Sequence, residues 1–333
     1  MNRFLPLLGL CLPLLAMAAN QNKYPTVGSI ERLDPAFDRL VAVDEKIEKL
    51  AEGFSWSEGP VWVKGELLFS DVPENSIHRW KPGTTGVDTF LKPSGMLSPV
   101  PGFREQGSNG LTLDGQGRLL ICQHGERRVA RYDKGQFTSI ADRFEGKKFN
   151  SPNDLVVHSS GTIYFTDPPY GLDGLNDSPL KELPFNGIYR VVPTGEVTLV
   201  SKTLTFPNGV ALSPDEKILY IGVSDGKSPG LMAYDVQPDG TLANERTFFD
   251  VRARSAAGDK GSCDGLKVDR EGNVWATGPG GVLVISPAGK LLGVIRPGVA
   301  NANCGWGDDG SMLYITAQNL LVRIKTLTKG AGW

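Results

Sequence analysis

The sequence is poor in cysteine and histidine and has no excess of either charge. Four cysteines and three histidines are spread over 333 residues, which argues against a disulfide framework. The 35 lysines and arginines nearly balance the 37 aspartates and glutamates, for a formal net charge of −2. No strong surface field therefore indicates nucleic acid or anionic lipid as a partner. We expect a small-molecule partner instead.

The apolar run that opens the chain is too short for a membrane anchor. Residues 4–15 follow the basic Arg3 and precede Ala16-Met17-Ala18, the pattern of a signal peptide with its cleavage site. A membrane-spanning helix needs about 20 apolar residues. We predict that residues 1–19 are a signal peptide, and that the mature protein is exported to the periplasm or secreted, without a membrane contact.

A short motif recurs along the chain wherever a new hydrophobic strand begins. Its copies are Ser57-Glu58-Gly59-Pro60, Ser108-Asn109-Gly110-Leu111, Pro152-Asn153-Asp154-Leu155, Pro207-Asn208-Gly209-Val210, Cys263-Asp264-Gly265-Leu266 and Asn303-Cys304-Gly305-Trp306. The intervals of about 40 to 56 residues are typical of propeller blades, since helical repeats are mostly shorter. The motif predicts about six blades.

Each motif is followed by strand signals rather than helix signals. A short apolar strand leads to a turn rich in Asp and Gly, and then to a strand dense in β-branched and aromatic residues, such as 162–166 or 312–316. A third strand with partial alternation and a fourth, outer strand complete the unit. Four antiparallel strands per unit predict an all-β, six-bladed β-propeller.

The two ends of the chain indicate how the ring closes. Residues 46–50 form a fourth strand placed before the first motif, whereas the last unit stops after its third strand near residues 321–324. The N-terminal strand therefore completes the last blade and covers two open sheet edges. We predict an N-terminal leader over residues 20–45 and a single propeller domain over 46–333.

Two connections are longer than the rest, at residues 92–106 and 168–185. Long loops in compact domains tend to be functional or disordered. Both connect strands at or just before the motif face, so we expect them to form rims or lids over the mouth.

The three cysteines of the mature chain are an odd number for an oxidising compartment. Cys263 and Cys304 lie beside motifs in consecutive blades, which makes a bridge conceivable. Inner strands of neighbouring blades usually diverge too far for disulfide geometry. Buried free thiols, Cys122 included, are the favoured interpretation.

The motifs also predict a metal site. Strand starts converge around a propeller axis, so Glu58, Asn153, Asn208 and Asp264 would offer two carboxylates and two amide oxygens around one point. Such an all-oxygen set suits calcium best and tolerates other divalent ions, with Zn²⁺ and Mg²⁺ as alternatives. The alternative is turn chemistry, because Asn, Asp and Gly are ordinary turn formers. Asn109 and Asn303 occupy the same place in the remaining blades, as substrate contacts or plain turn residues.

The ordered set of motifs resembles a known family. The strings SWSEGPVW, SNGLTLD, SPNDLVV, PNGVALS and CDGLKVDREGNVWA are similar to the gluconolactonase branch of the family that also holds senescence marker protein 30, calcium-dependent organophosphate hydrolases and luciferin-regenerating enzymes. The match spans the mature chain. It implies a six-bladed propeller with one calcium or zinc ion near the axis, bound by Glu58, Asn153, Asn208 and Asp264.

The resemblance implies hydrolysis of a sugar lactone such as a gluconolactone. In that hypothesis the ion polarises the ring carbonyl, and Asp264 orients or deprotonates the attacking water. The substrate contacts would include Asn109, Asn153 and Asp167. The alternative role for Asp167 is that of a hydrogen-bond acceptor in a turn. His124 follows a strand that returns to the motif face, and is a candidate proton shuttle or a structural histidine.

Two other functions fit the same ligand set. An ion of this kind would also polarise a phosphoryl oxygen, which gives a calcium-dependent phosphotriesterase or another esterase. A non-catalytic exported propeller that binds a sugar, with structural calcium, belongs to a different class. Fold alone does not separate them.

Overall fold

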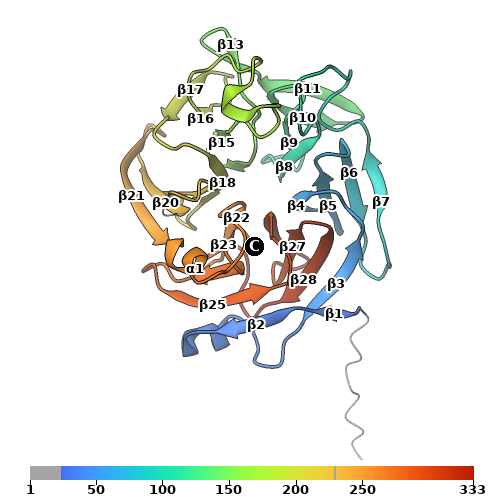
Figure 1. Cartoon of the computed structure of the whole chain (residues 1–333), viewed down its shortest axis with the longest axis vertical. Coiled ribbons are helices and arrows are strands. Elements are labelled where there is room, and N and C mark those ends of the chain that lie inside the picture. The colour runs from blue at the N-terminus through green and yellow to red at the C-terminus, as the bar shows by residue number, and fades with distance from the viewer. Residues whose placement is uncertain (1–23, 229) are drawn as a thin grey trace, which may run out of the picture.

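The computed structural model describes residues 24–228 and 230–333, so the predicted signal peptide at residues 1–19 lies outside the described residues. Six antiparallel sheets surround a central axis (Figure 1). Innermost strands of successive blades contact one another around the whole ring, including the last blade with the first. The six-bladed β-propeller predicted from the motif spacing is confirmed. In the described residues no helix is long and apolar enough to cross a membrane.

The first three blades are simple four-stranded meanders that run from the axis outward. Blade 1 contains β4 (Ser57–Val63), β5 (Glu66–Asp71), β6 (Ser76–Trp80) and β7 (Asp88–Leu91). Blade 2 contains β8 (Ser108–Leu113), β9 (Leu119–Gln123), β10 (Arg128–Asp133) and β11 (Gln136–Ala141). Blade 3 contains β14 (Leu155–Val157), β15 (Ile163–Asp167), β16 (Gly187–Val191) and β17 (Val197–Ser201).

Blade 4 has four strands, like the first three blades, whereas blades 5 and 6 each gain an edge strand from the N-terminal leader. Blade 4 contains β18 (Pro207–Leu212), β19 (Ile218–Val223), β20 (Gly230–Val236) and β21 (Leu242–Asp250). Blade 5 contains β22 (Leu266–Val268), β23 (Val274–Gly278), β24 (Gly281–Ile285) and β25 (Leu291–Arg296), with β2 (Ser29–Arg32) at its edge. Blade 6 contains β26 (Asn303–Gly307), β27 (Met312–Ala317), β28 (Leu320–Lys325) and β3 (Ile47–Glu52), with β1 (Thr26–Val27) at its edge.

The remaining elements are short and lie in the connections. They are the two-stranded hairpin β12 (Arg143–Phe144) and β13 (Lys147–Lys148), the 3-10 helices η1 (Pro35–Arg39) and η2 (Leu175–Asp177), and the helix α1 (Arg252–Ala256).

Turn residues fix the hairpins as the sequence predicts. Between β8 and β9, Asp114 Oδ1 accepts hydrogen bonds from the backbone amides of Gln116 and Arg118 at 2.9 and 3.0 Å. Gly117 adopts a φ of 71°, a conformation that costs little for a residue without a Cβ. This local chemistry sets the register in which Leu113 pairs with Leu119.

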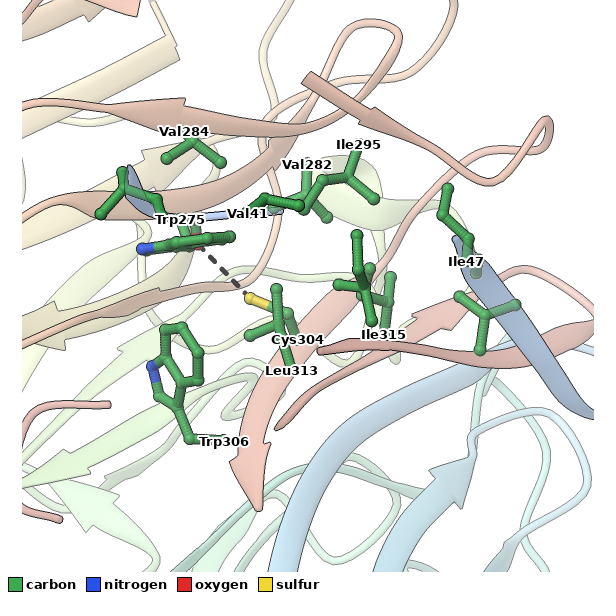
Figure 2. Packing of buried hydrophobic residues seen from close by; sticks show 14 of the residues in the cluster. Val41, Ile47, Trp275, Val282, Val284, Ile295, Cys304, Trp306, Leu313 and Ile315 are labelled. Carbon is green, nitrogen blue, oxygen red and sulfur yellow. Dashed lines mark hydrogen bonds between the residues drawn. The ribbon is translucent and has the colours of Figure 1, made fainter. Parts of the chain in front are cut away.

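The hydrophobic core lies between neighbouring blades rather than at the axis. Between blades 5 and 6, Trp275 and Trp306 meet edge to face at a centroid distance of 5.2 Å, beside Cys304 and Leu313 (Figure 2). Cys304 Sγ donates to the backbone oxygen of Trp275 at 3.4 Å. Cys122, Cys263 and Cys304 are all free and buried, which confirms the interpretation as free thiols, without a bridge between Cys263 and Cys304.

The N-terminal strand closes the ring, as predicted. β3 pairs antiparallel with β28, with Glu52 opposite Leu320. The leader extends this closure to a second blade, because β2 pairs with β25. There Glu31 accepts a hydrogen bond from Arg254 at 3.0 Å and one from Arg296 at 2.9 Å.

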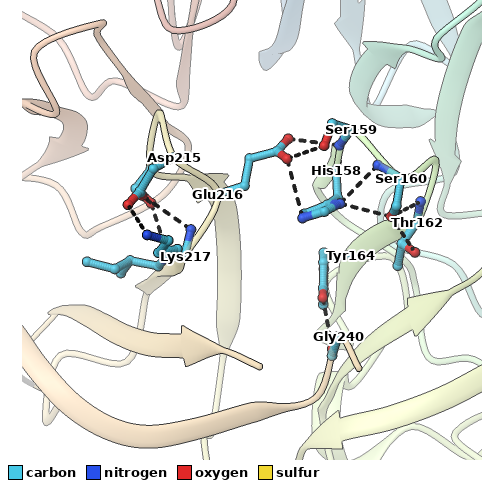
Figure 3. Close-up of polar contacts among 11 residues, drawn as sticks. His158, Ser159, Ser160, Thr162, Tyr164, Asp215, Glu216, Lys217 and Gly240 are labelled. Carbon is cyan, nitrogen blue, oxygen red and sulfur yellow. Dashed lines mark hydrogen bonds and ion pairs between the residues drawn. The ribbon is translucent and has the colours of Figure 1, made fainter. Parts of the chain in front are cut away.

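A polar contact joins blades 3 and 4 at the end of the inner strands that lies away from the motifs (Figure 3). Glu216 Oε1 accepts a hydrogen bond from the Ser159 amide at 2.8 Å, and its Oε2 lies 3.3 Å from His158 Nε2. This contact links the two hairpin turns, so His158 serves packing between blades far from the motif face.

Candidate metal and substrate site

The structure brings all four predicted ligands to one cavity. Glu58, Asn153, Asn208 and Asp264 line the same cavity of about 410 Å³, at the end of the ring where the inner strands begin. That volume is within the range of small-molecule sites. Each ligand belongs to a different blade, so the site exists only when the ring is closed.

Glycine in the motif lets the inner strands approach one another. A Cβ at Gly209 would lie 2.3 Å from the backbone oxygen of Asp264, and one at Gly110 would lie 2.5 Å from Asp154 Oδ1. Real Cβ atoms do not come so close, so a side chain at either position would push the blades apart. The register also shifts at the predicted ligands: after Glu58 in β4, and between Pro207 and Val210, around Asn208, in β18. Such bulges redirect side chains beside a site.

Hydrogen bonds orient the ligand side chains. Glu58 Oε2 accepts from the Gly59 amide at 2.8 Å and from Asn303 Nδ2 at 3.1 Å. Asn208 Nδ2 donates to Ser224 Oγ at 2.8 Å, which leaves the amide oxygen of Asn208 as the atom available to a cation. Ser224 in turn donates to the backbone oxygen of Cys263 at 2.7 Å. This chain of contacts connects blades 4 and 5 at the cavity.

Burial and neighbouring carboxylates disfavour negative charge on the acids of the site. Burial, and then repulsion from Glu58, raise the pKa of Asp264 well above its usual range. Burial, and then the charge of Asp154, likewise raise the pKa of Glu58, although Lys267 opposes this shift. Asp264 Oδ1 is buried without a hydrogen-bond partner in the described part of the chain. A bound divalent cation would satisfy that oxygen and stabilise the ionised carboxylates, so the residues present fit the predicted ion.

A third acid, which is not one of the predicted ligands, shares a hydrogen-bond donor with Glu58. Asp154 is buried, and the amide of Asn303 donates to both Glu58 Oε2 and Asp154 Oδ2, the latter at 3.4 Å. Asn303 therefore holds two carboxylates, and does not line the cavity. The sequence marked Asp154 only as the acid that follows Asn153.

The other predicted site residues divide into two groups. Asn109 lines the cavity, and its buried Oδ1 has no hydrogen-bond partner among the described residues. Asp167 and His124 are fully buried and are not part of the cavity lining. Asp167 Oδ2 accepts from the Asn150 amide at 2.8 Å, and burial raises the pKa of Asp167 to about 7. For the basic side chain of His124 burial has the opposite effect and lowers the pKa to about 3.

Both long loops reach the cavity, as expected of rims. Arg104 and Glu105 come from the first loop and Tyr170 from the second. The loops pair with each other, because the Arg104 amide donates to the backbone oxygen of Gly171 at 3.0 Å, and Phe103 forms a bridge with Leu172. The length of the loops indicated this location, but nothing in the sequence pattern singled out the three side chains.

Comparisons with known proteins agree over most of the chain. Residues 56–319 match the model of a protein family described as the SMP-30/gluconolactonase/LRE-like region. A gluconolactonase from Zymomonas mobilis is 41% identical over 324 residues, which cover 94% of this chain and 90% of the relative. Regucalcin from Oryctolagus cuniculus is 26% identical over 275 residues, which cover 80% of this chain and 84% of the relative.

A solved structure has the same architecture. The structure of a gluconolactonase from Xanthomonas campestris aligns with a TM-score of 0.79 and 31% sequence identity, over 91% of this chain and 97% of that chain.

Proposed function

Because the chain belongs to the SMP-30/gluconolactonase/LRE-like family, we propose that it is a lactonase that hydrolyses a sugar lactone in the cavity at the motif end of the ring. One observation carries the proposal beyond family membership. Four oxygen-bearing side chains from four blades line a single cavity, and two of them are buried carboxyls whose pKa is raised. Such a site is arranged for a cation and a small molecule together.

Glu58, Asn153, Asn208 and Asp264 would hold one divalent cation. The all-oxygen donor set favours Ca²⁺, with Zn²⁺ and Mg²⁺ as alternatives. Two carboxylate charges would balance the ion, and four side chains leave positions for water or substrate. When bound, the ion supplies Lewis acidity toward an ester carbonyl oxygen and toward a water molecule.

The chain's own residues orient the reactants. The unpartnered Oδ1 of Asp264 is the acceptor for a proton of the attacking water. Asn109, whose amide oxygen is also unpartnered, is placed to bind a hydroxyl group of the sugar. Arg104 and Tyr170 line the mouth, where they limit access of bulk water and offer further donors to the sugar.

The test is hydrolysis of glucono-1,5-lactone by the mature protein after metal removal, with and without added calcium. The Asp264→Asn variant keeps the shape of the side chain and is expected to lose at least about 100-fold in kcat, because proton transfer by one side chain contributes about that much. Asp173→Asn is the matched control, since Asp173 is exposed on the second long loop.

Each alternative has its own outcome in this experiment. Activity on a phosphotriester but not on the lactone would replace the proposal with an organophosphate hydrolase. No activity on either compound, with calcium still raising the unfolding temperature, would point to a binding propeller with a structural ion. Lactonase activity that stays the same after metal removal would refute the role of the ion.

We also propose that the mature protein works outside the cytoplasm. The pattern of residues 1–19, with its basic start, apolar run and small residues, supports export. N-terminal sequencing of the protein from a periplasmic or culture fraction should begin near Asn20. An intact N-terminus in the cytoplasmic fraction would contradict export.

A further inference from the structure

Glu105 is an acid in the cavity that the predicted ion does not need. It lies on the first long loop and lines the cavity together with the four predicted ligands. The backbone of Arg104 and Glu105 is held against Gly171, since both amides point to that carbonyl, at 3.0 and 3.4 Å. The pairing of the two loops therefore fixes the position of the Glu105 side chain at the mouth.

The carboxyl group of Glu105 is only partly compensated. Its Oε1 forms an ion pair with Arg104 at 3.1 Å, and its Oε2 lies 3.8 Å from His124 Nδ1. In the described part of the chain this carboxyl group accepts no hydrogen bond. The side chain is 16% exposed, and burial raises the pKa of Glu105 although the charge of Arg104 opposes the shift.

Four titratable or charged groups face Glu105. Arg104 lies on the same loop, Tyr170 on the paired loop, His124 after β9 and Asp264 before β22. Burial raises the pKa values of Tyr170 and Asp264, and the negative charge of Glu105 adds to both shifts. A carboxyl whose pKa is raised in this way holds its proton more firmly than an exposed glutamate does, which suits a proton donor in a cavity.

We propose that Glu105 is a second catalytic residue of this site, which delivers a proton to the ring oxygen of the lactone as that oxygen leaves. The inference rests on the proposed lactonase function. It assigns to Glu105 the donation of a proton to the leaving oxygen, because a cation keeps the carboxylates bound to it ionised and so without a proton to give.

The step balances with water as the second reactant. The water oxygen forms a bond with the carbonyl carbon, and the bond between that carbon and the ring oxygen breaks. The electron pair of the broken bond stays on the ring oxygen, which takes the proton of the Glu105 carboxyl and becomes a hydroxyl group. The attacking water gives its proton to Asp264, and that proton passes through solvent in the cavity to the Glu105 carboxylate, so both side chains return to their starting state.

His124 is the positioning residue for Glu105. Its ring is fully buried, and burial, followed by the charge of Arg104, lowers the pKa of His124 to about 3 although a contact with the Glu105 backbone opposes the shift. Within the described residues neither ring nitrogen makes a hydrogen bond of good geometry. The tautomer with a proton on Nδ1 would direct a donor toward Glu105 Oε2, 3.8 Å away, and the Cβ of His124 lies close to Gly171 on the paired loop. His124 would thus act through Glu105 rather than on the substrate.

The experiment compares wild type, Glu105→Gln and Glu126→Gln in lactone hydrolysis by the calcium-loaded mature protein. Glu126 accepts a hydrogen bond from Leu97 at the start of the same loop, and a glutamine there keeps that acceptor, so this control is expected to match wild type. Glu105→Gln should lower kcat by about 100-fold or more with KM changed less than about threefold, and should remove one limb of the pH profile of kcat. His124→Asn should shift that limb, and Glu105→Asp should restore part of kcat.

Four outcomes would overturn the inference in distinguishable ways. A wild type without lactonase activity refutes the proposed function and the role of Glu105 together. An active wild type with Glu105→Gln equally active refutes the role of Glu105 alone. A raised KM with normal kcat makes Glu105 a substrate contact without a role in proton transfer. A loss of kcat accompanied by loss of the calcium-induced rise in unfolding temperature would mean that the variant has damaged the ion site.

Discussion

At the scale of single residues, burial separates side chains that can meet a substrate from those that cannot. Asp167 and His124 both follow strands that return to the motif face, as the sequence predicts, yet both side chains are fully buried. Strand order places a residue at one end of a blade, but loop packing decides whether its side chain reaches solvent. The two long loops cover these residues and present Arg104, Glu105 and Tyr170 in their place.

The burial of Asp167 leads to a prediction about how protein stability depends on pH. Burial raises its pKa to about 7, although the Asn150 amide and then Arg127 oppose the shift. Between the unfolded pKa near 4 and the folded pKa near 7 the native state holds an extra proton, so this contribution to stability falls as pH rises. Relative to wild type, Asp167→Asn should gain roughly 2–3 kcal/mol in free energy of unfolding between pH 5 and pH 8.

Urea unfolding of both proteins at several pH values measures this gain. The same variant tests the sequence hypothesis that Asp167 contacts the substrate, because a buried residue outside the cavity should leave KM unchanged. A pH-independent difference in stability would contradict the raised pKa. A large rise in KM with normal stability would restore Asp167 as a substrate contact.

At the scale of elements, the leader is more than a connection to the propeller. β1 and β2 run along the outer edges of blades 6 and 5 (Figure 1). Phe37, in η1 directly after β2, is fully buried in the core of these two blades. The sequence predicted β3 from the missing fourth strand of the last blade. It could not predict β1 and β2, because a fifth edge strand is not required by the repeat.

Phe37 is therefore expected to contribute to the stability of the ring. Phe37→Ala should lower the free energy of unfolding by about 3–5 kcal/mol, since it leaves a cavity in a packed core. Val43→Ala, at a side chain that is 71% exposed, is the control and should change little. Denaturant unfolding measures both. Equal stability of the two variants would mean that the leader only rests on the propeller.

At the scale of the whole molecule, the repeat explains why so much of the site was predictable. Symmetry brings strand starts together at the axis, so a motif read from sequence spacing gives both the fold and the convergence of Glu58, Asn153, Asn208 and Asp264. The third acid Asp154, which stands where most motifs have glycine, and the rim residues follow no repeat, because each depends on one local packing arrangement. Sequence periodicity predicts what blades share, and it carries no signal for what distinguishes them.

The same geometry predicts how an ion would affect the whole molecule. Its four ligands belong to blades 1, 3, 4 and 5, so the ion would bind the closed ring and not the unfolded chain. Calcium at 100 times its Kd should then raise the free energy of unfolding by about 2.7 kcal/mol. Thermal unfolding with calcium and with a chelator measures the effect, with Asp173→Asn as a control that responds as wild type does.

Asp264→Asn makes this last prediction sharper, because it removes a buried acid whose pKa is raised by burial and then by the charge of Glu58. Without calcium, the variant should be at least as stable as wild type, since it buries one negative charge fewer. With calcium, wild type should become the more stable protein, because the variant has lost a ligand. The order of the two unfolding temperatures should therefore reverse when calcium is added. An unchanged order, with wild type insensitive to calcium, would mean that the four side chains hold no ion.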